Sequence, residues 1–163
     1  MPRRTSLVAG LVTAGLAIFK ERDRFAGKTR KQSHPTSRRV ATGTRVEYSP
    51  DIDGDADPGE VVWTWVPYED DPSKGKDRPV VIIGRTGDDL AAVPLTSKDR
   101  GHGQVAVGTG DWDRGGRPSF AKVDQLLVVR EGDVRREGAA LDRRHFDEVV
   151  AGTARFHDLV RTD

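Results

Sequence analysis

The sequence predicts a small, mainly β domain whose strands close into a barrel or half-barrel, followed by one α-helix. Short apolar runs rich in Val, Ile and Trp recur between residues 61 and 129, and turns rich in Gly and Asp separate them. Several short strands at this spacing favour a barrel over an α/β sheet. Towards the C-terminus the apolar residues recur instead at intervals of three and four residues, which is the period of a helix packed on one face.

The first three predicted strands form the centre of the domain, and we expect them to pair with one another. A charged loop that contains Gly and Pro, residues 68–77, joins the first strand to the second and ends at Arg78. We expect this loop to be the working surface of the domain. The six predicted strands are Val61–Val66, Pro79–Ile83, Leu90–Leu95, Gln104–Gly108, Ser119–Val123 and Leu126–Val129.

A helix is predicted over Asp142–Val160, with Asp142 placed to cap its N-terminus. His157 falls on its apolar face, so we interpret it as a packed side chain and not as a catalytic group. The histidines of the chain lack the spacing of a metal-binding pair, and we predict neither a metal site nor a cofactor. The predicted apolar face consists of Phe146, Val149, Val150, Thr153, Phe156 and Val160.

Residues 1–57 are predicted to form a separate N-terminal part, and residues 58–163 the barrel domain. Ser6–Phe19 is an apolar run of 14 residues, short of the roughly 20 that a membrane-spanning helix needs. We expect a helix here that docks on the body or lies on a membrane surface through residues 3–20. The segment Thr29–Arg45 is polar and basic without apolar periodicity, which indicates a flexible linker.

The charge is divided unevenly along the chain. Residues 1–45 carry a net charge of +9 and residues 46–163 carry −8, so a basic arm precedes an acidic body. A basic arm suggests an anionic partner such as nucleic acid, a membrane surface or an acidic protein, whereas an acidic body can bind RNA only at a local patch. The chain has no Cys, which excludes disulfides and thiolate metal sites and is compatible with a reducing cytosol.

An acidic segment, residues 51–60, invites comparison with a calcium-binding EF-hand loop because Asp residues alternate at its start. Such a loop requires Gly at its sixth position and Glu at its twelfth, where this chain has Ala56 and Val62. We therefore interpret the segment as a solvated acidic turn before the first strand.

Four short motifs follow one another along the predicted body. They are Gly-Glu-Val-Val-Trp at Gly59–Trp63, Gly-x-x-Arg-Pro at Gly75–Pro79, Pro-Leu-Thr-Ser-Lys at Pro94–Lys98 and Val-Asp-Gln at Val123–Gln125. In their order and spacing they resemble the PemK/MazF family of toxin endoribonucleases, over about two thirds of the chain. The resemblance implies an SH3-like barrel, a homodimer, a cognate antitoxin and a growth-inhibiting role in a type II toxin-antitoxin system.

Cleavage of RNA without a metal requires the 2′-hydroxyl to attack the adjacent phosphate, so a site must move protons and stabilise the charge of the transition state. The resemblance implies catalytic roles for Arg78 and Thr96, which match the family's Arg-Pro and Pro-x-Thr-Ser steps. A guanidinium can hold the phosphate with two hydrogen bonds but is a poor base, and a hydroxyl can donate to a phosphate oxygen. The proton transfers could rely on the substrate, on water or on an arginine in a strongly perturbed environment.

Further polar side chains are candidates for contacts with the RNA backbone. Trp112 is expected to stack a base, because readers of single-stranded RNA commonly stack bases on aromatic rings. Trp63 and Trp65 alternate within a predicted strand, which favours a place in the core or on a dimer surface. The polar candidates are Lys74, Lys76, Ser97, Lys98, Arg100, Arg114 and Arg117.

We therefore predict a cytoplasmic, metal-independent endoribonuclease that acts on single-stranded RNA, forms a homodimer and is held in check by an antitoxin. A second interpretation is a non-catalytic toxin or protein-interaction module on the same barrel, as in CcdB-like inhibition of gyrase. The presence of both Arg78 and Thr96 argues against it. A third interpretation is a membrane-associated binding protein positioned by the N-terminal helix.

Overall fold

The structure is a computed structural model that describes residues 43–162, apart from the side chains of residues 136–138. The predicted N-terminal helix and residues 29–42 of the predicted linker lie outside the described residues. The strands are β1 Thr44–Val46, β2 Glu60–Pro67, β3 Gly75–Thr86, β4 Asp89–Thr96, β5 Gln104–Gly108, β6 Ser119–Lys122, β7 Leu127–Val129, β8 Arg136–Ala140 and β9 Leu159–Arg161. The helix α1 spans Arg143–Thr153, and a 3₁₀ turn spans Glu131–Asp133.

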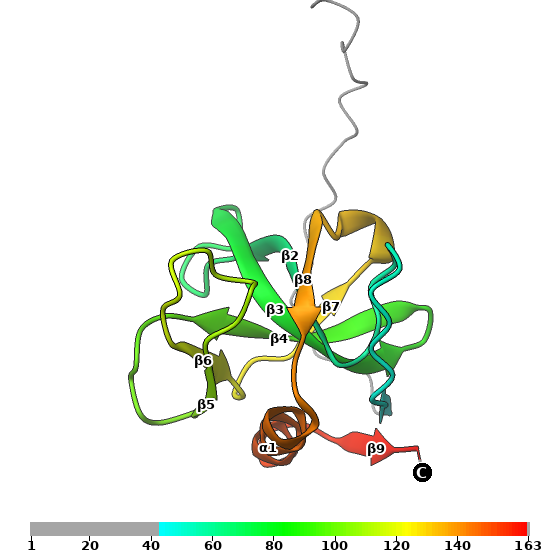
Figure 1. The fold of residues 1–163 in the computed structure, drawn as a ribbon. Helices are drawn as coiled ribbons and strands as arrows, with labels where there is room; N and C mark the ends of the chain where they lie inside the picture. The colour runs from blue at the N-terminus through cyan, green and yellow to red at the C-terminus, as the bar shows by residue number, and fades with distance from the viewer. Residues whose placement is uncertain (1–42, 163) are drawn as a thin grey trace, which may run out of the picture. The chain divides into compact units, whose positions relative to one another are not determined.

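The long strand β3 is the centre of the sheet (Figure 1). Its first part, residues 75–81, pairs antiparallel with β2, and its second part, residues 80–86, pairs antiparallel with β4. This confirms that the first three predicted strands pair with one another. The apolar run of β3 is continuous because both of its faces are buried: Val80 and Ile82 pack in one core cluster, and Val81 and Ile83 in the other.

The remaining strands curl this sheet into a half-barrel (Figure 1). Strands β6 and β7 pair with β4, β5 pairs with β6, and β8 pairs with the outer edge of β2. The helix α1 closes one end, because its buried residues Phe146, Val149 and Val150 belong to the same core cluster as Val81 and Ile83. The predicted mainly β fold with a C-terminal helix is therefore confirmed.

The helix is shorter than the predicted span of residues 142–160. It ends at Thr153, and the chain then extends into β9, which pairs parallel with β1. Phe156 and Val160, which were expected on the buried helical face, are 46% and 55% exposed. The helical spacing of these two residues was misleading, because Phe156 lies in the turn that follows the helix and Val160 lies in β9, where it pairs with Arg45 of β1. The described part of the chain contains no helix long and apolar enough to cross a membrane.

Strand β1 lies at the end of the segment that was predicted to be a linker, and before the predicted start of the body at residue 58. It pairs with β3 on one side and with β9 on the other. Strands β1 and β3 approach closely at Gly84 of β3, where a Cβ atom would lie 1.9 Å from the carbonyl oxygen of Arg45. A strand of three residues gives too little sequence pattern to be predicted, and the linker interpretation of Thr44 and Arg45 is wrong.

Candidate functional site

The candidate site begins where β3 and β4 separate. Their ladder ends at the pair Val80–Pro94. Beyond it, β3 continues beside β2 alone, while β4 continues beside β6. Pro79 and Pro94 have no backbone N–H. A hydrogen-bonded pair formed by Val80 with Pro94, or by Pro79 with Leu95, would therefore lack one of its two donors. The prolines thus weaken the β3–β4 ladder at the point where the sheet forks.

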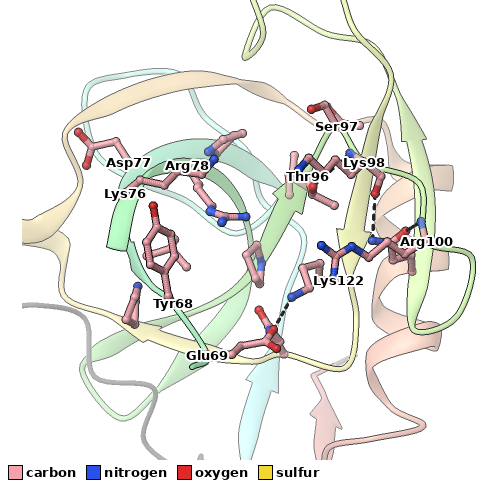
Figure 2. A pocket seen from close by; sticks show the side chains of 18 of the residues that line it. Tyr68, Glu69, Lys76, Asp77, Arg78, Thr96, Ser97, Lys98, Arg100 and Lys122 are labelled. Carbon is pink, nitrogen blue, oxygen red and sulfur yellow. Dashed lines mark hydrogen bonds and ion pairs between the residues drawn. The ribbon is translucent and has the colours of Figure 1, made fainter. Parts of the chain in front are cut away.

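Arg78 and Thr96 lie on the two arms of the fork. Each is two residues beyond the last pair, so strand alternation places both on the face of Val80 and Pro94. Both line a cleft of about 510 Å³. Figure 2 shows the Arg78 side chain pointing into the middle of the opening, between Tyr68 and Thr96.

Side chains from several elements converge on this cleft. Besides Arg78 and Thr96, the predicted site residues that line it are Lys76, Ser97, Lys98, Arg100 and Arg117. The predicted residues Lys74, Trp112 and Arg114 do not line it. Lys74 instead pairs with Asp71 inside the loop between β2 and β3, at 2.9 Å.

The guanidinium of Arg78 has no ion-pair partner among the described residues. Its side chain is half-buried, and its Nε is buried without a hydrogen-bond partner in the described part of the chain. Its Cζ lies 6.0 Å from the centre of the Tyr68 ring, which contributes only a weak cation–π interaction. A partly desolvated cation without an anion favours an anionic ligand, because the ligand would supply the missing hydrogen bonds.

Thr96 is oriented by the backbone that follows it. Its Oγ1 accepts a hydrogen bond from the Lys98 N–H at 3.2 Å, so its hydroxyl proton remains to be donated. Gln104 orders the same loop: its amide oxygen accepts from the Arg100 N–H at 2.8 Å, and its amide nitrogen donates to the Lys98 carbonyl at 3.2 Å. Thr96 can therefore act as a hydrogen-bond donor into the cleft.

The charge of the cleft is locally positive within an acidic body. Asp77 is paired with Arg135 at 3.2 Å, and Asp113 with Arg117 at 2.9 Å. The hydrogen bond from Arg117, with another from the Gly115 N–H, lowers the pKa of Asp113 and keeps it ionised. Among the described residues, four lining cations have no carboxylate partner: Lys76, Arg78, Lys98 and Arg100.

Trp112 is not placed to stack a base, so this prediction was wrong. It is 4% exposed and belongs to the core. Its Nε1 donates to the Ser119 hydroxyl at 3.1 Å, and its carbonyl accepts from the Trp63 Nε1 at 3.1 Å. The ring folds back over Gly110, where a Cβ would be 2.1 Å away. The surrounding Gly- and Asp-rich loop is exposed, as its sequence suggested, but the Trp112 ring is buried beneath it.

Several lining residues were not named as site residues from the sequence, among them Lys122 and, within the loop expected to be the working surface, Tyr68 and Glu69. Lys122 lies on β6 and forms an ion pair with Glu69 across the cleft mouth (Figure 2). Alternation along β6 could have indicated Lys122, because it follows the buried Ala121. Within residues 43–162, no group of three or more His, Asp or Glu side chains is placed to hold a metal ion.

The chain is similar to one protein family and to several solved structures. A family model described as PemK-like, MazF-like toxin of type II toxin-antitoxin system matches residues 57–156. MazF from Deinococcus radiodurans is 18% identical, with 63% of this chain and 96% of that chain covered and a TM-score of 0.50. This likeness shows the fold.

Two mycobacterial structures match over a similar length. The Mycobacterium tuberculosis toxin MazF-mt6 is 19% identical over 62% of this chain and 98% of that chain, with a TM-score of 0.47. An endoribonuclease in complex with its cognate antitoxin, from a mycobacterial species, is 16% identical over 60% and 90%, with a TM-score of 0.48. No curated protein sequence matches the chain.

Proposed function

The chain belongs to the PemK-like, MazF-like family of toxins of type II toxin-antitoxin systems, and on that premise we propose that it is an endoribonuclease. Its substrate is single-stranded RNA, and its cleavage step needs no metal. The observation that carries this proposal is the fork, which directs an unpaired guanidinium and a hydroxyl donor into one cleft.

In the proposed reaction the 2′-hydroxyl oxygen bonds to the adjacent phosphorus as the bond from phosphorus to the 5′-oxygen breaks. The 2′-hydroxyl loses its proton, and the departing 5′-oxygen gains one. The products are a 2′,3′-cyclic phosphate and a 5′-hydroxyl end. The phosphorane gains negative charge on the way, so a positioned cation and a hydroxyl donor lower the barrier.

Arg78 is the residue that holds the scissile phosphate and neutralises this charge. Its guanidinium stays protonated and offers donors in a planar fork that matches phosphate oxygens. Thr96 donates its free proton to a phosphate oxygen and so fixes the orientation of the phosphorus. Lys76, Lys98 and Arg100 contact the phosphates on either side of the cleavage point.

We further propose that the protein acts as a homodimer in the cytoplasm and is inhibited by a cognate antitoxin. The fold is that of MazF from Deinococcus radiodurans, and other crystals of that protein contain both MazE and MazF. The position of the cleft at an open fork supports inhibition by an antitoxin, because an antitoxin segment bound in the cleft would exclude RNA.

The test is incubation of the purified full chain with a long single-stranded RNA in EDTA, followed by mapping of the new ends. The wild type should cut at discrete positions and leave 5′-hydroxyl ends. Arg78→Ala and Thr96→Ala should each lower the cleavage rate by about 10²–10³-fold, the usual effect of removing one donor to a developing oxyanion. Arg144→Ala on α1, outside the cleft, is the matched control. Intact RNA in the presence of a folded wild-type protein would favour a non-catalytic binding module.

A further inference from the structure

We propose that Lys122 is a second phosphate-binding residue of the cleft, and that Glu69 occupies it until RNA displaces the carboxylate. This inference rests on the proposed action on RNA and specifies how the same cleft admits its substrate. The bound strand would place one phosphate on Arg78 and a neighbouring phosphate on Lys122.

The sheet places Lys122 beside the proposed reaction centre. Thr96 pairs with Phe120 in the β4–β6 ladder, and Lys122 is two residues further along β6. Strand alternation therefore puts Lys122 on the same face as Phe120 and Thr96. Its side chain is 21% exposed and lines the cleft, so its stem is packed and its ammonium group is positioned.

Glu69 reaches Lys122 from the opposite wall. It lies in the loop between β2 and β3, 53 residues before Lys122 in the chain. Figure 2 shows their ion pair across the mouth of the cleft, below Arg78. The pair therefore connects the loop between β2 and β3 to β6.

The ion pair of Lys122 differs from that of Arg117 with Asp113. Asp113 lies four residues from Arg117 and also accepts from the Gly115 N–H, so that pair is part of a local turn. The Glu69 side chain is 68% exposed, and among the described residues the only hydrogen-bond or ion-pair partner of its carboxylate is Lys122. An exposed pair of this kind contributes little to stability, so a competing anion can replace the carboxylate.

A phosphodiester is a suitable replacement. Like a carboxylate it carries one negative charge and presents oxygen acceptors, and an ammonium group has three donors to offer. The exchange leaves Lys122 paired and sends Glu69 into water. It also moves a negative charge away from the RNA backbone, which otherwise repels it.

The test measures binding and cleavage separately. Affinity of the full chain for a fluorescent single-stranded 2′-O-methyl RNA, which lacks the attacking hydroxyl, is determined over a series of KCl concentrations. Glu69→Gln should bind about threefold to fivefold more tightly than the wild type, because an exposed pair is readily lost. Lys122→Gln should bind more weakly, and the slope of log K against log salt should fall in magnitude by about 0.7, the value for one lost phosphate contact on a single strand.

The double variant Glu69→Gln/Lys122→Gln identifies the mechanism. If Glu69 acts by competing for Lys122, the gain from Glu69→Gln should be clearly smaller in the Lys122→Gln background than in the wild type. Equal gains in both backgrounds would show that Glu69 acts as a general surface charge and would overturn the inference. An unchanged salt slope in Lys122→Gln would overturn it as well.

Matched controls come from α1. Glu148→Gln and Arg144→Gln break an exposed pair outside the cleft with the same changes of net charge, and both should leave affinity and slope unchanged. Failure of the wild type to bind the RNA at all would overturn the proposed function together with this inference. Binding and cleavage by the wild type, with equal gains from Glu69→Gln in both backgrounds, would overturn the inference alone.

Discussion

Arg78 on β3 and Thr96 on β4 each lie two residues beyond Val80 and Pro94, the last pair that joins the two strands. The prolines at the end of the ladder therefore lie within two residues of the side chains that project into the opening. Pro79 follows Arg78, and Pro94 precedes Thr96 by two positions. Each of the two motifs, Arg-Pro and Pro-x-Thr-Ser, thus contains a proline at the end of the β3–β4 ladder and a side chain that lines the cleft beyond it.

Arg78→Met should separate stability from activity. Met replaces the guanidinium by an apolar chain of similar length and removes a buried Nε without a partner among the described residues. We expect the free energy of unfolding in urea to be unchanged or to rise by up to about 1 kcal/mol, while RNA cleavage is lost. Arg130→Met, at an exposed position outside the cleft, is the control. A loss of stability of about 2 kcal/mol or more would identify Arg78 as a structural residue.

Thr96→Ser and Thr96→Val should differ strongly in activity. Ser keeps a hydroxyl that can accept from the Lys98 N–H and donate into the cleft, so cleavage should fall by no more than about tenfold. Val keeps the shape and removes the donor, so cleavage should fall by about 10²–10³-fold. Single-turnover rates with saturating enzyme measure this difference. Equal rates for the two variants would exclude a role for the hydroxyl.

Tyr68→Leu should weaken RNA binding, whereas Trp112→Phe should lower the stability of the fold. Tyr68 lines the cleft, and if a base stacks on it, Leu should weaken RNA binding by about 1–3 kcal/mol. Trp112→Phe removes the donor to the buried Ser119 and should lower the free energy of unfolding by about 1–3 kcal/mol. Its affinity for RNA should not change. Calorimetric titration and urea denaturation of both variants check this, and weaker RNA binding by Trp112→Phe would contradict the structure.

The carboxylate of Asp142 should make the free energy of unfolding depend on pH in the acidic range. Its carboxylate accepts from the side chain and from the backbone N–H of His145, and these hydrogen bonds lower its pKa below the ordinary value of 3.8. Because the pKa is lower in the folded state, the stabilisation is complete above about pH 4 and is lost as the pH falls through the folded value. Urea unfolding between pH 2 and pH 7 measures it.

Substitution at position 142 separates capping from charge. Asp142→Ala should cost about 0.5–2 kcal/mol at neutral pH, the usual effect of removing an N-cap. Asn caps a helix about as well as Asp but does not titrate, so Asp142→Asn should keep most of the neutral stability and flatten the acid limb. An unchanged acid limb in Asp142→Asn would assign the pH dependence to other carboxylates.

The strands that the sequence predicted are those whose signal is local. The runs that became β2, β3 and β4 are apolar on both faces and are bounded by turns, so their pattern did not depend on distant partners. Strands β1 and β9 have three residues each and form by pairing with strands that are distant in the sequence, β1 with β3 and β9 and β9 with β1, which no local pattern encodes. The predicted helix overran its end because the apolar spacing continued into β9.

The candidate site also contains residues that a local motif could indicate and residues that only the fold brings together. Arg78 and Thr96 were singled out by the resemblance of their Arg-Pro and Pro-x-Thr-Ser motifs to the family, and both line the cleft, while their catalytic roles remain a prediction. The contact of Glu69 with Lys122 joins residues 53 positions apart, and only the curl of the sheet brings them together. Trp112 was misplaced because residues around it are exposed while its own ring is buried.

The parallel pairing of β1 with β9 has a consequence for the order in which the chain folds. Closing this edge joins the two ends of the described chain, so it carries the largest loop-closure entropy in the sheet. A ribosome that has released residues up to β6 has already provided every strand of the fork. We therefore expect the nascent chain to assemble the cleft first, through short-range hairpins, and to complete the sheet edge only after β9 has emerged.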